Sequence, residues 1–152
     1  MADHLSALQN WVCRDVFKRG MSPLSSKIKI RIDIGEHSFT LTKTDAGQNI
    51  VSRVPVNPDI SFFIPESSFQ TLIENRSEEV ATVGISILKH LIEPNPNLRA
   101  YIKVHLGLFD LMRLGYLSVL PLGGPTMVKF LASQGINGIG KLKEVISKLR
   151  NS

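Results

Sequence analysis

The sequence has a single cysteine and lacks a long, uninterrupted run of apolar residues. Cys13 is the only cysteine among 152 residues, which excludes an internal disulfide and a cysteine-rich zinc site. The N-terminus has no basic lead and no apolar segment, so we expect no signal peptide. The most apolar stretch, residues 106–122, is interrupted by charges, glycine and proline, so we expect no membrane span. A reducing, cytoplasmic location fits these absences.

Acidic residues are scarce in the C-terminal third. Residues 99–152 hold eight Lys or Arg and two Asp or Glu, a net charge of +6, whereas the first 98 residues hold ten basic and eleven acidic residues, a net charge of −1. Such a segment either attracts an anionic partner (phosphate, nucleic acid or a lipid surface) or is a solvated basic face. Composition leaves both interpretations open.

The overall composition of the chain is typical of a globular protein. Hydrophobic residues make up 43% and charged residues 20%, enough apolar surface to bury a core and to exclude disorder as the main state. We expect one domain over residues 1–152.

Hydrophobic periodicity predicts the order of elements. Apolar residues alternate strictly over residues 28–34 and again over 98–106, and this alternation is typical of strands with one dry face. Elsewhere the apolar spacing is helical. The expected helices span residues 4–19, 66–75, 77–91, 108–120, 125–133 and 139–150, and the expected strands span 28–34, 38–42, 48–54, 60–64 and 98–106. The sequence therefore predicts an α+β fold, a five-stranded mostly antiparallel sheet with helices packed on one face, its first four strands forming an antiparallel meander.

Catalytic and metal-binding patterns are weak. The four histidines share no ligand spacing and no serine lies in a nucleophile elbow. We expect His105 to be exposed on a strand and Cys13 to be a buried, inert thiol in a helix. We therefore expect no enzyme activity, no cofactor and no metal.

A glycine-rich loop supports a different function. Residues 136–143 resemble the hairpin of a helix-hairpin-helix DNA-binding motif, in which backbone amides at a helix start bind phosphate and Lys141 and Lys143 are adjacent. A plain glycine turn that starts the last helix explains the same residues, and we favour it. Nucleic-acid binding is the alternative function.

Three stretches resemble the sterol carrier protein type-2 family of lipid-transfer domains. They are the early strands over residues 27–34 and 37–43, the strand-then-helix element over 57–73, and the strand running into an apolar helix over 101–114. The resemblance spans residues 5–120 and leaves 121–152 as a C-terminal helical extension. It implies a hydrophobic tunnel between sheet and helices. Accessory proteins of quinone biosynthesis share this domain type, so a prenyl ligand is a variant of the same function.

The residues themselves also point to a ligand. The expected helix over 108–120 is apolar nearly all round, more than one buried stripe requires, so either the C-terminal helices or a ligand must cover it. We interpret the chain as a non-catalytic carrier of a fatty acid, phospholipid, sterol-like or prenyl molecule, and keep a partner-binding adaptor as a third possibility. The expected lining residues are Phe62, Phe69, Leu72, Ile102, Val104, Phe109, Met112, Met127 and Phe130. The expected contacts with an anionic membrane are Lys141, Lys143, Lys148 and Arg150.

Overall fold

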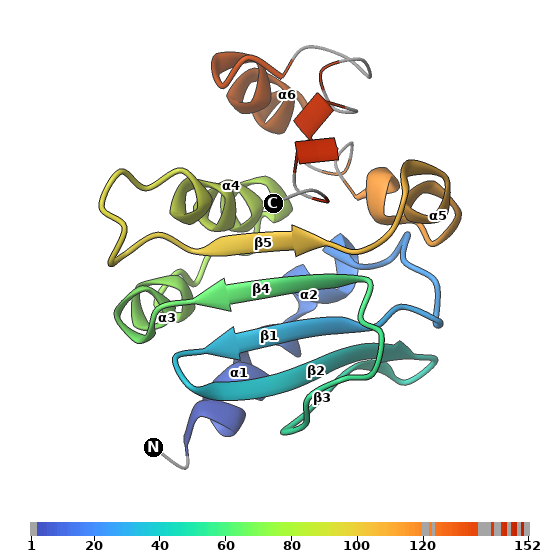
Figure 1. Ribbon diagram of the computed structural model, residues 1–152, viewed down its shortest axis with the longest axis vertical. Coiled ribbons are helices and arrows are strands. Elements are labelled where there is room, and N and C mark those ends of the chain that lie inside the picture. Colours follow the sequence, from blue (N-terminus) through green and yellow to red (C-terminus); the bar gives the residue numbers. More distant parts are fainter. Residues whose placement is uncertain are drawn as a thin grey trace.

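The computed structural model describes residues 3–119, 122, 124–136, 141, 144–145, 147–148 and 150, and its chain alternates between helical and extended blocks (Figure 1). The helices are α1 (Asp3–Val12), α2 (Asp15–Gly20), α3 (Glu66–Ile73), α4 (Val80–Leu91), α5 (Leu108–Arg113), the 3-10 helix η1 (Tyr116–Ser118) and α6 (Gly124–Ser133). The strands are β1 (Ile30–Ile34), β2 (His37–Thr44), β3 (Gly47–Val51), β4 (Ile60–Ile64) and β5 (Tyr101–Val104).

The five strands form one sheet in the order β3-β2-β1-β4-β5. Tight turns join β1 to β2 and β2 to β3, and these pairs are antiparallel, as is the pair β4 and β5. The pair β1 and β4 is parallel, so the expected antiparallel meander is wrong at the fourth strand. The loop over residues 52–59 contains Pro55 and Pro58, forms no hairpin, and returns the chain to the far side of β1. A loop of that kind brings β4 in along the direction of β1.

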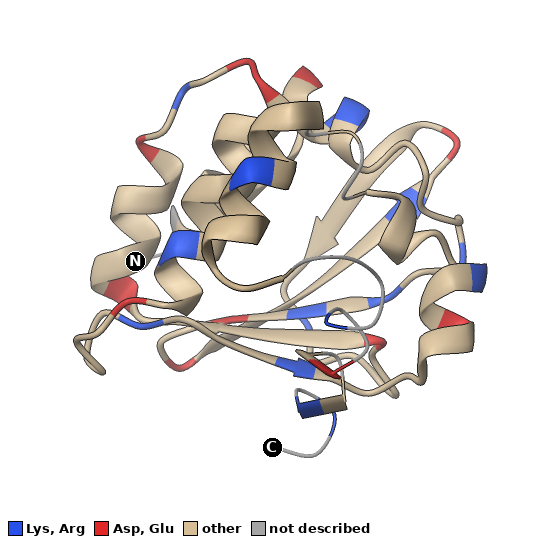
Figure 2. Ribbon diagram, turned by 90° about the horizontal axis from the view of Figure 1, so that it is seen from above, with Lys and Arg blue, Asp and Glu red and all other residues tan. Residues whose placement is uncertain are grey.

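The sheet has one dry face and one wet face. In β1, Ile30, Ile32 and Ile34 are buried in the core, whereas Arg31 and Asp33 on the opposite face form an ion pair of 3.0 Å. Figure 2 shows the sheet nearly edge-on with most of the helices on one side of it. The expected fold class, a mostly antiparallel α+β sheet covered on one face, is therefore confirmed.

The first expected helix, residues 4–19, is broken. Arg14 is extended (φ −68°, ψ 153°) between α1 and α2, and its guanidinium donates hydrogen bonds to the carbonyls of Asn75 (2.9 Å) and Ser77 (2.7 Å). These bonds to the segment before α4 replace the helical continuation. Cys13 lies at the break and is exposed, so the expectation of a buried thiol is wrong.

The expected helix over 108–120 is broken as well. Gly115 has φ +92°, and a Cβ built on it would lie 2.0 Å from the carbonyl oxygen of Pro23. This close approach ends α5 and starts η1, and Ser25 N donates a 2.9 Å hydrogen bond to the carbonyl of Leu114 beside it. An uninterrupted apolar helix at this place, the expected source of surplus hydrophobic surface, is therefore a wrong prediction.

The C-terminal segment is described in part. Residues 141, 144, 145, 147, 148 and 150 are helical, in keeping with the expected last helix, whereas 137–140, 142 and 143 of the expected hairpin lie outside the described residues. Within the described part of the chain, no helix has the length and apolar character needed to cross a bilayer.

Candidate functional site: an apolar cavity

A cavity of about 440 Å³ lies between the dry face of the sheet and the helices. Its lining comes from nearly every layer of the molecule. The sheet contributes Ile30, Ile32, Leu41, Ile60, Phe62, Ile64, Ile102 and Val104, the helices α1 to α4 contribute Trp11, Val12, Val16, Phe17, Gly20, Leu72, Val80, Val83, Gly84 and Ile87, and the remaining segments contribute Met21, Leu24, Leu111, Tyr116, Leu117, Val119 and Val145.

The sheet side of the cavity follows from the two-residue alternation of the strands. Ile32 pairs with Phe62 across β1 and β4, and Phe62 pairs with Ile102 across β4 and β5. Residues opposite each other in a ladder point to the same face, so these side chains form a row under the helices.

The helix side follows from helical spacing in α4. Val80, Val83, Gly84 and Ile87 recur at intervals of three and four residues, which places them on one face of the helix. Gly84 also permits close packing by α6, because a Cβ on it would lie 2.9 Å from the terminal methyl of Met127. The helix α6 therefore packs against α4 through Met127, which is itself buried.

The chemistry of the lining is almost wholly apolar. Of the lining side chains, only those of Tyr116 and Trp11 carry a nitrogen or oxygen atom. The Tyr116 hydroxyl donates a 2.7 Å hydrogen bond to Oδ2 of Asp59, which does not line the cavity. Burial, together with this carboxylate, raises the pKa of Tyr116 well above its ordinary value of 10.0, so the phenol stays protonated. The hydroxyl proton of Tyr116 is therefore used in the hydrogen bond to Asp59.

The indole of Trp11 is different. Trp11 is 7% exposed, and among the described residues its Nε1 is the buried side-chain polar atom that has no hydrogen-bond partner. A buried N–H group without a partner costs about 1–3 kcal/mol relative to a satisfied one. Because neighbouring atoms close off this N–H, it is an unsatisfied group within the packing and not a donor presented to the cavity.

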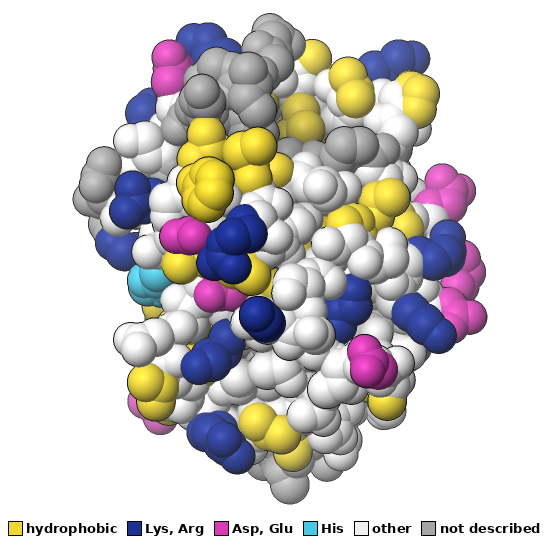
Figure 3. Space-filling view, turned by 90° about the vertical axis from the view of Figure 1, so that its right-hand side faces the viewer, with side chains coloured by type: hydrophobic (Ala, Val, Ile, Leu, Met, Phe, Trp, Pro, Cys, Tyr) yellow, Lys and Arg dark blue, Asp and Glu magenta, His cyan; other side chains and the backbone are white. Residues whose placement is uncertain are grey.

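The expected lining residues separate into three groups. Phe62, Leu72, Ile102 and Val104 line the cavity. Phe69 and Met127 are buried elsewhere, and Phe130 is half-buried. Phe109 (78% exposed) and Met112 (55% exposed) lie on the outward side of α5, and Figure 3 shows hydrophobic side chains gathered beside Lys and Arg on the side of the molecule that carries this helix.

The lining residues that sequence reasoning missed include every one on α1, α2 and α4, as well as five on the sheet and those of the remaining segments. Trp11, Val12 and Val16 had a signal, namely their helical apolar spacing, as did Val80 and Val83. That spacing identifies a buried face. It contains no information about whether the face meets other side chains or a hollow, because both require the same residues.

A Ser-His pair lies on the opposite, wet face of the sheet. Ser61 Oγ is 2.9 Å from Nε2 of His105, which is exposed as expected from the sequence. Ser61 is only 3% exposed, so its hydroxyl is shielded from an external substrate. The geometry favours a structural hydrogen bond between β4 and the residue after β5.

The basic residues of the C-terminal segment are placed at the surface where the structure describes them. Lys141, Lys148 and Arg150 are exposed, and Lys141 forms a 3.5 Å ion pair with Glu144. Lys143 lies outside the described residues. Lys148 and Arg150 are the cations available for a test of membrane contact.

Among solved structures, one that is similar to this chain was identified by comparison. It is described as "UbiJ-SCP2 Ubiquinone synthesis protein", is 14% identical, and aligns with a TM-score of 0.43 over 80% of this chain and 93% of its own. No protein-family model matches the sequence, and no curated protein matches it either.

Proposed function

We propose that this protein binds a lipid or another long hydrophobic molecule in the internal cavity and carries it without covalent chemistry. The observation that supports the proposal is a hollow of about 440 Å³ with an almost wholly apolar wall. Ligand pockets measure about 300–1,000 Å³ and are lined mainly by hydrophobic side chains, so the cavity has the size and the lining of a ligand site. Water gains few hydrogen bonds there, whereas an acyl or prenyl chain gains apolar contacts along the wall.

The energetics favour an aliphatic ligand. Each methylene group that leaves water contributes about 0.8 kcal/mol, so several methylenes are enough for useful affinity even after the cost of association. Apolar side chains that face a hollow of this size lack dispersion contacts on that side. A ligand restores those contacts.

The lining suits the apolar part of a ligand. Of its two polar side chains, Trp11 has its N–H closed off by neighbouring atoms, and Tyr116 has its hydroxyl already bound to Asp59. Fatty acids, phospholipids, sterol-like molecules and prenylated quinone precursors all contain a long apolar part that fits such a wall.

The chain offers a direct assay, because Trp11 is its only tryptophan and lines the cavity. We expect a fatty acid brominated along its chain to quench the fluorescence of Trp11 in a saturable manner, and the same acid without bromine to compete. Native mass spectrometry of the purified protein should show co-purified or added lipid at one molecule per chain. Quenching that never saturates, together with an apo mass under lipid excess, contradicts the proposal.

Loading from a membrane is the second part of the proposed function. Lys148 and Arg150 are exposed on the basic C-terminal segment, which suits contact with anionic headgroups. Replacing both by Glu should weaken binding to phosphatidylglycerol vesicles, whereas Lys18→Glu with Lys27→Glu makes the same charge change at exposed sites in the N-terminal part. Equal losses for the two double variants would show that net charge alone matters.

A further inference from the structure

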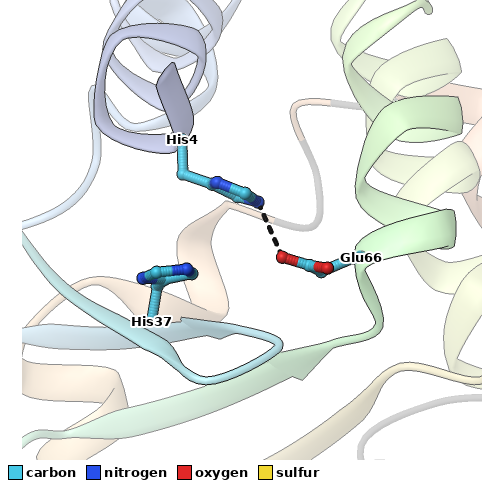
Figure 4. A group of neighbouring side chains, drawn as sticks. All are labelled: His4, His37 and Glu66. Carbon is cyan, nitrogen blue, oxygen red and sulfur yellow. Dashed lines mark ion pairs between the residues drawn. The ribbon is translucent and has the colours of Figure 1, made fainter. Parts of the chain in front are cut away.

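Two histidines and a glutamate meet at one end of the molecule, outside the apolar cavity. His4 comes from the start of α1, His37 from the start of β2 and Glu66 from the start of α3 (Figure 4). One ligand-type atom of each, an imidazole nitrogen or a carboxylate oxygen, lies within 4.8 Å of the others. His4 Nε2 is 3.0 Å from Oε1 of Glu66. None of the three lines the cavity.

Neighbouring residues contact two of these side chains. The ring of His4 stacks on buried Phe69 with centroids 6.0 Å apart and an interplanar angle of 17°. The stem of Glu66 lies against the turn between β1 and β2, where a Cβ on Gly35 would be 2.9 Å from Glu66 Cγ. Gly35 has φ +59°, so the turn and the close approach both require glycine.

The two rings lie close enough to share one ion. The centroids of His4 and His37 are 4.9 Å apart, and the planes are tilted by 30°. An imidazole nitrogen and a carboxylate oxygen each donate a lone pair to a metal ion. Three such donor atoms within 4.8 Å of one another suit a single shared cation.

The donor set fits a transition metal. Two imidazoles and one carboxylate, with a further position left for water, form a recurring three-ligand site for Zn²⁺, at metal-ligand distances of about 2.0–2.2 Å. Ligand atoms in such a tetrahedral site are about 3.3 Å apart, so the widest pair here must approach by a small rotation. His37 and Glu66 are both exposed, and their side chains have room for it.

We propose that His4, His37 and Glu66 bind a divalent transition-metal ion, with Zn²⁺ as the best match to the donor set. The ion links the first helix, the β1–β2 hairpin and α3, three segments far apart in the sequence. Because its ligands are separate from the cavity lining, the site stands whether or not the cavity binds a lipid.

The test uses untagged full-length protein and ZnCl₂ in isothermal titration calorimetry. We expect one ion per chain, and a rise in melting temperature of about 5 °C or more at an ion concentration of about one hundred times Kd. His37→Ala and Glu66→Gln should each weaken binding by more than about 100-fold, since even outer-shell changes cost up to that much. His90→Gln is the matched control, because the His90 ring is bonded to the Ser86 carbonyl within α4.

The variants remain informative because both replaced side chains are exposed, and their melting without zinc reports folding directly. Substitution of Co²⁺ should give visible absorption bands of nitrogen and oxygen ligation without the thiolate charge-transfer band that Cys13 would produce. No binding by the unaltered protein at millimolar zinc overturns the proposal. Equal binding by His37→Ala, Glu66→Gln and the control overturns it as well, and would leave His4 and Glu66 as a structural ion pair.

Discussion

Tyr116 and Asp59 join two distant parts of the chain through a 2.7 Å hydrogen bond from the phenol hydroxyl to Oδ2 of the carboxylate. Asp59 is 8% exposed, and the same Oδ2 accepts a 2.9 Å bond from the backbone N–H of Lys29. The backbone of Asp59 bonds to the Lys29 carbonyl and to the N–H of His105. Asp59 thus ties η1 to the ends of three neighbouring strands, through its carboxylate at Tyr116 and Lys29 and through its backbone at Lys29 and His105.

Removing the phenol hydroxyl should destabilise the fold. We expect Tyr116→Phe to lower the free energy of unfolding by about 1.5–3 kcal/mol, because a buried carboxylate loses a charge-assisted hydrogen bond. Urea unfolding followed by circular dichroism measures this change. Tyr101→Phe is the control, since Tyr101 is 49% exposed, and it should change the free energy by no more than about 0.5 kcal/mol.

The same pair should produce an alkaline dependence of stability. The folded state raises the pKa of Tyr116 above the ordinary 10.0, chiefly through burial and then through the bond to Asp59. Above pH 10.0 the unfolded chain releases this proton while the folded chain keeps it, so the stability present at lower pH is lost as the pH rises. Between about pH 10 and 11.5 the unaltered protein should lose more stability than Tyr116→Phe does. Parallel curves for the two proteins would contradict the assignment.

Gly115 should tolerate no side chain. A Cβ at this position meets the Pro23 carbonyl at 2.0 Å, and the backbone has φ +92°. We expect Gly115→Ala to cost more than about 3 kcal/mol, from the strained backbone and the forced displacement of the segment before β1. Gly107→Ala is the matched control at the other end of α5, where nothing lies within 4 Å, and it should cost about 1 kcal/mol or less. Thermal melting of both variants distinguishes them.

A larger side chain in the cavity should abolish ligand binding without lowering the stability of the protein. Val83 is 5% exposed and lines the hollow, so Val83→Phe adds ring atoms to empty space. We expect stability to be retained or raised, and quenching of Trp11 by the brominated acid to be lost. In a closely packed core the same change costs about 1–3 kcal/mol. A destabilised Val83→Phe that still binds the acid would argue against a hollow at this position.

The two exposed residues of α5 provide the complementary test. Phe109 and Met112 lie outside the cavity and in solvent. Phe109→Ala and Met112→Ala should therefore leave both the quenching constant and the melting temperature close to those of the unaltered protein. A large loss of lipid binding in either variant would place the ligand against α5 instead of under α4.

Periodicity predicted the strands well because an exposed polar face and a buried apolar face leave an alternating pattern that needs no tertiary information. Ile30, Ile32 and Ile34 are a clear example. The parallel pairing of β1 with β4 has no corresponding pattern in the sequence. An alternating strand has the same pattern whichever neighbour it joins, and the choice depends on how the loop before β4 crosses the sheet.

The helix breaks and the cluster of His4, His37 and Glu66 depend on contacts between distant segments, which periodicity does not reveal. Arg14 ends α1 because carbonyls more than sixty residues away accept its guanidinium hydrogen bonds. Gly115 ends α5 because the backbone of Pro23 lies against it. His4, His37 and Glu66 have no local spacing to notice, since they come together only when three separate elements meet.

Amino-acid order alone was sufficient for the fold class, because burial on one side of each strand and helix is a local property of side-chain spacing. It was also sufficient for four members of the cavity wall, Phe62, Leu72, Ile102 and Val104. Whether apolar faces close on one another or enclose a hollow depends on the distance between layers. That distance is set by contacts between residues remote in sequence, so only the folded chain decided where the cavity lies and which helices surround it.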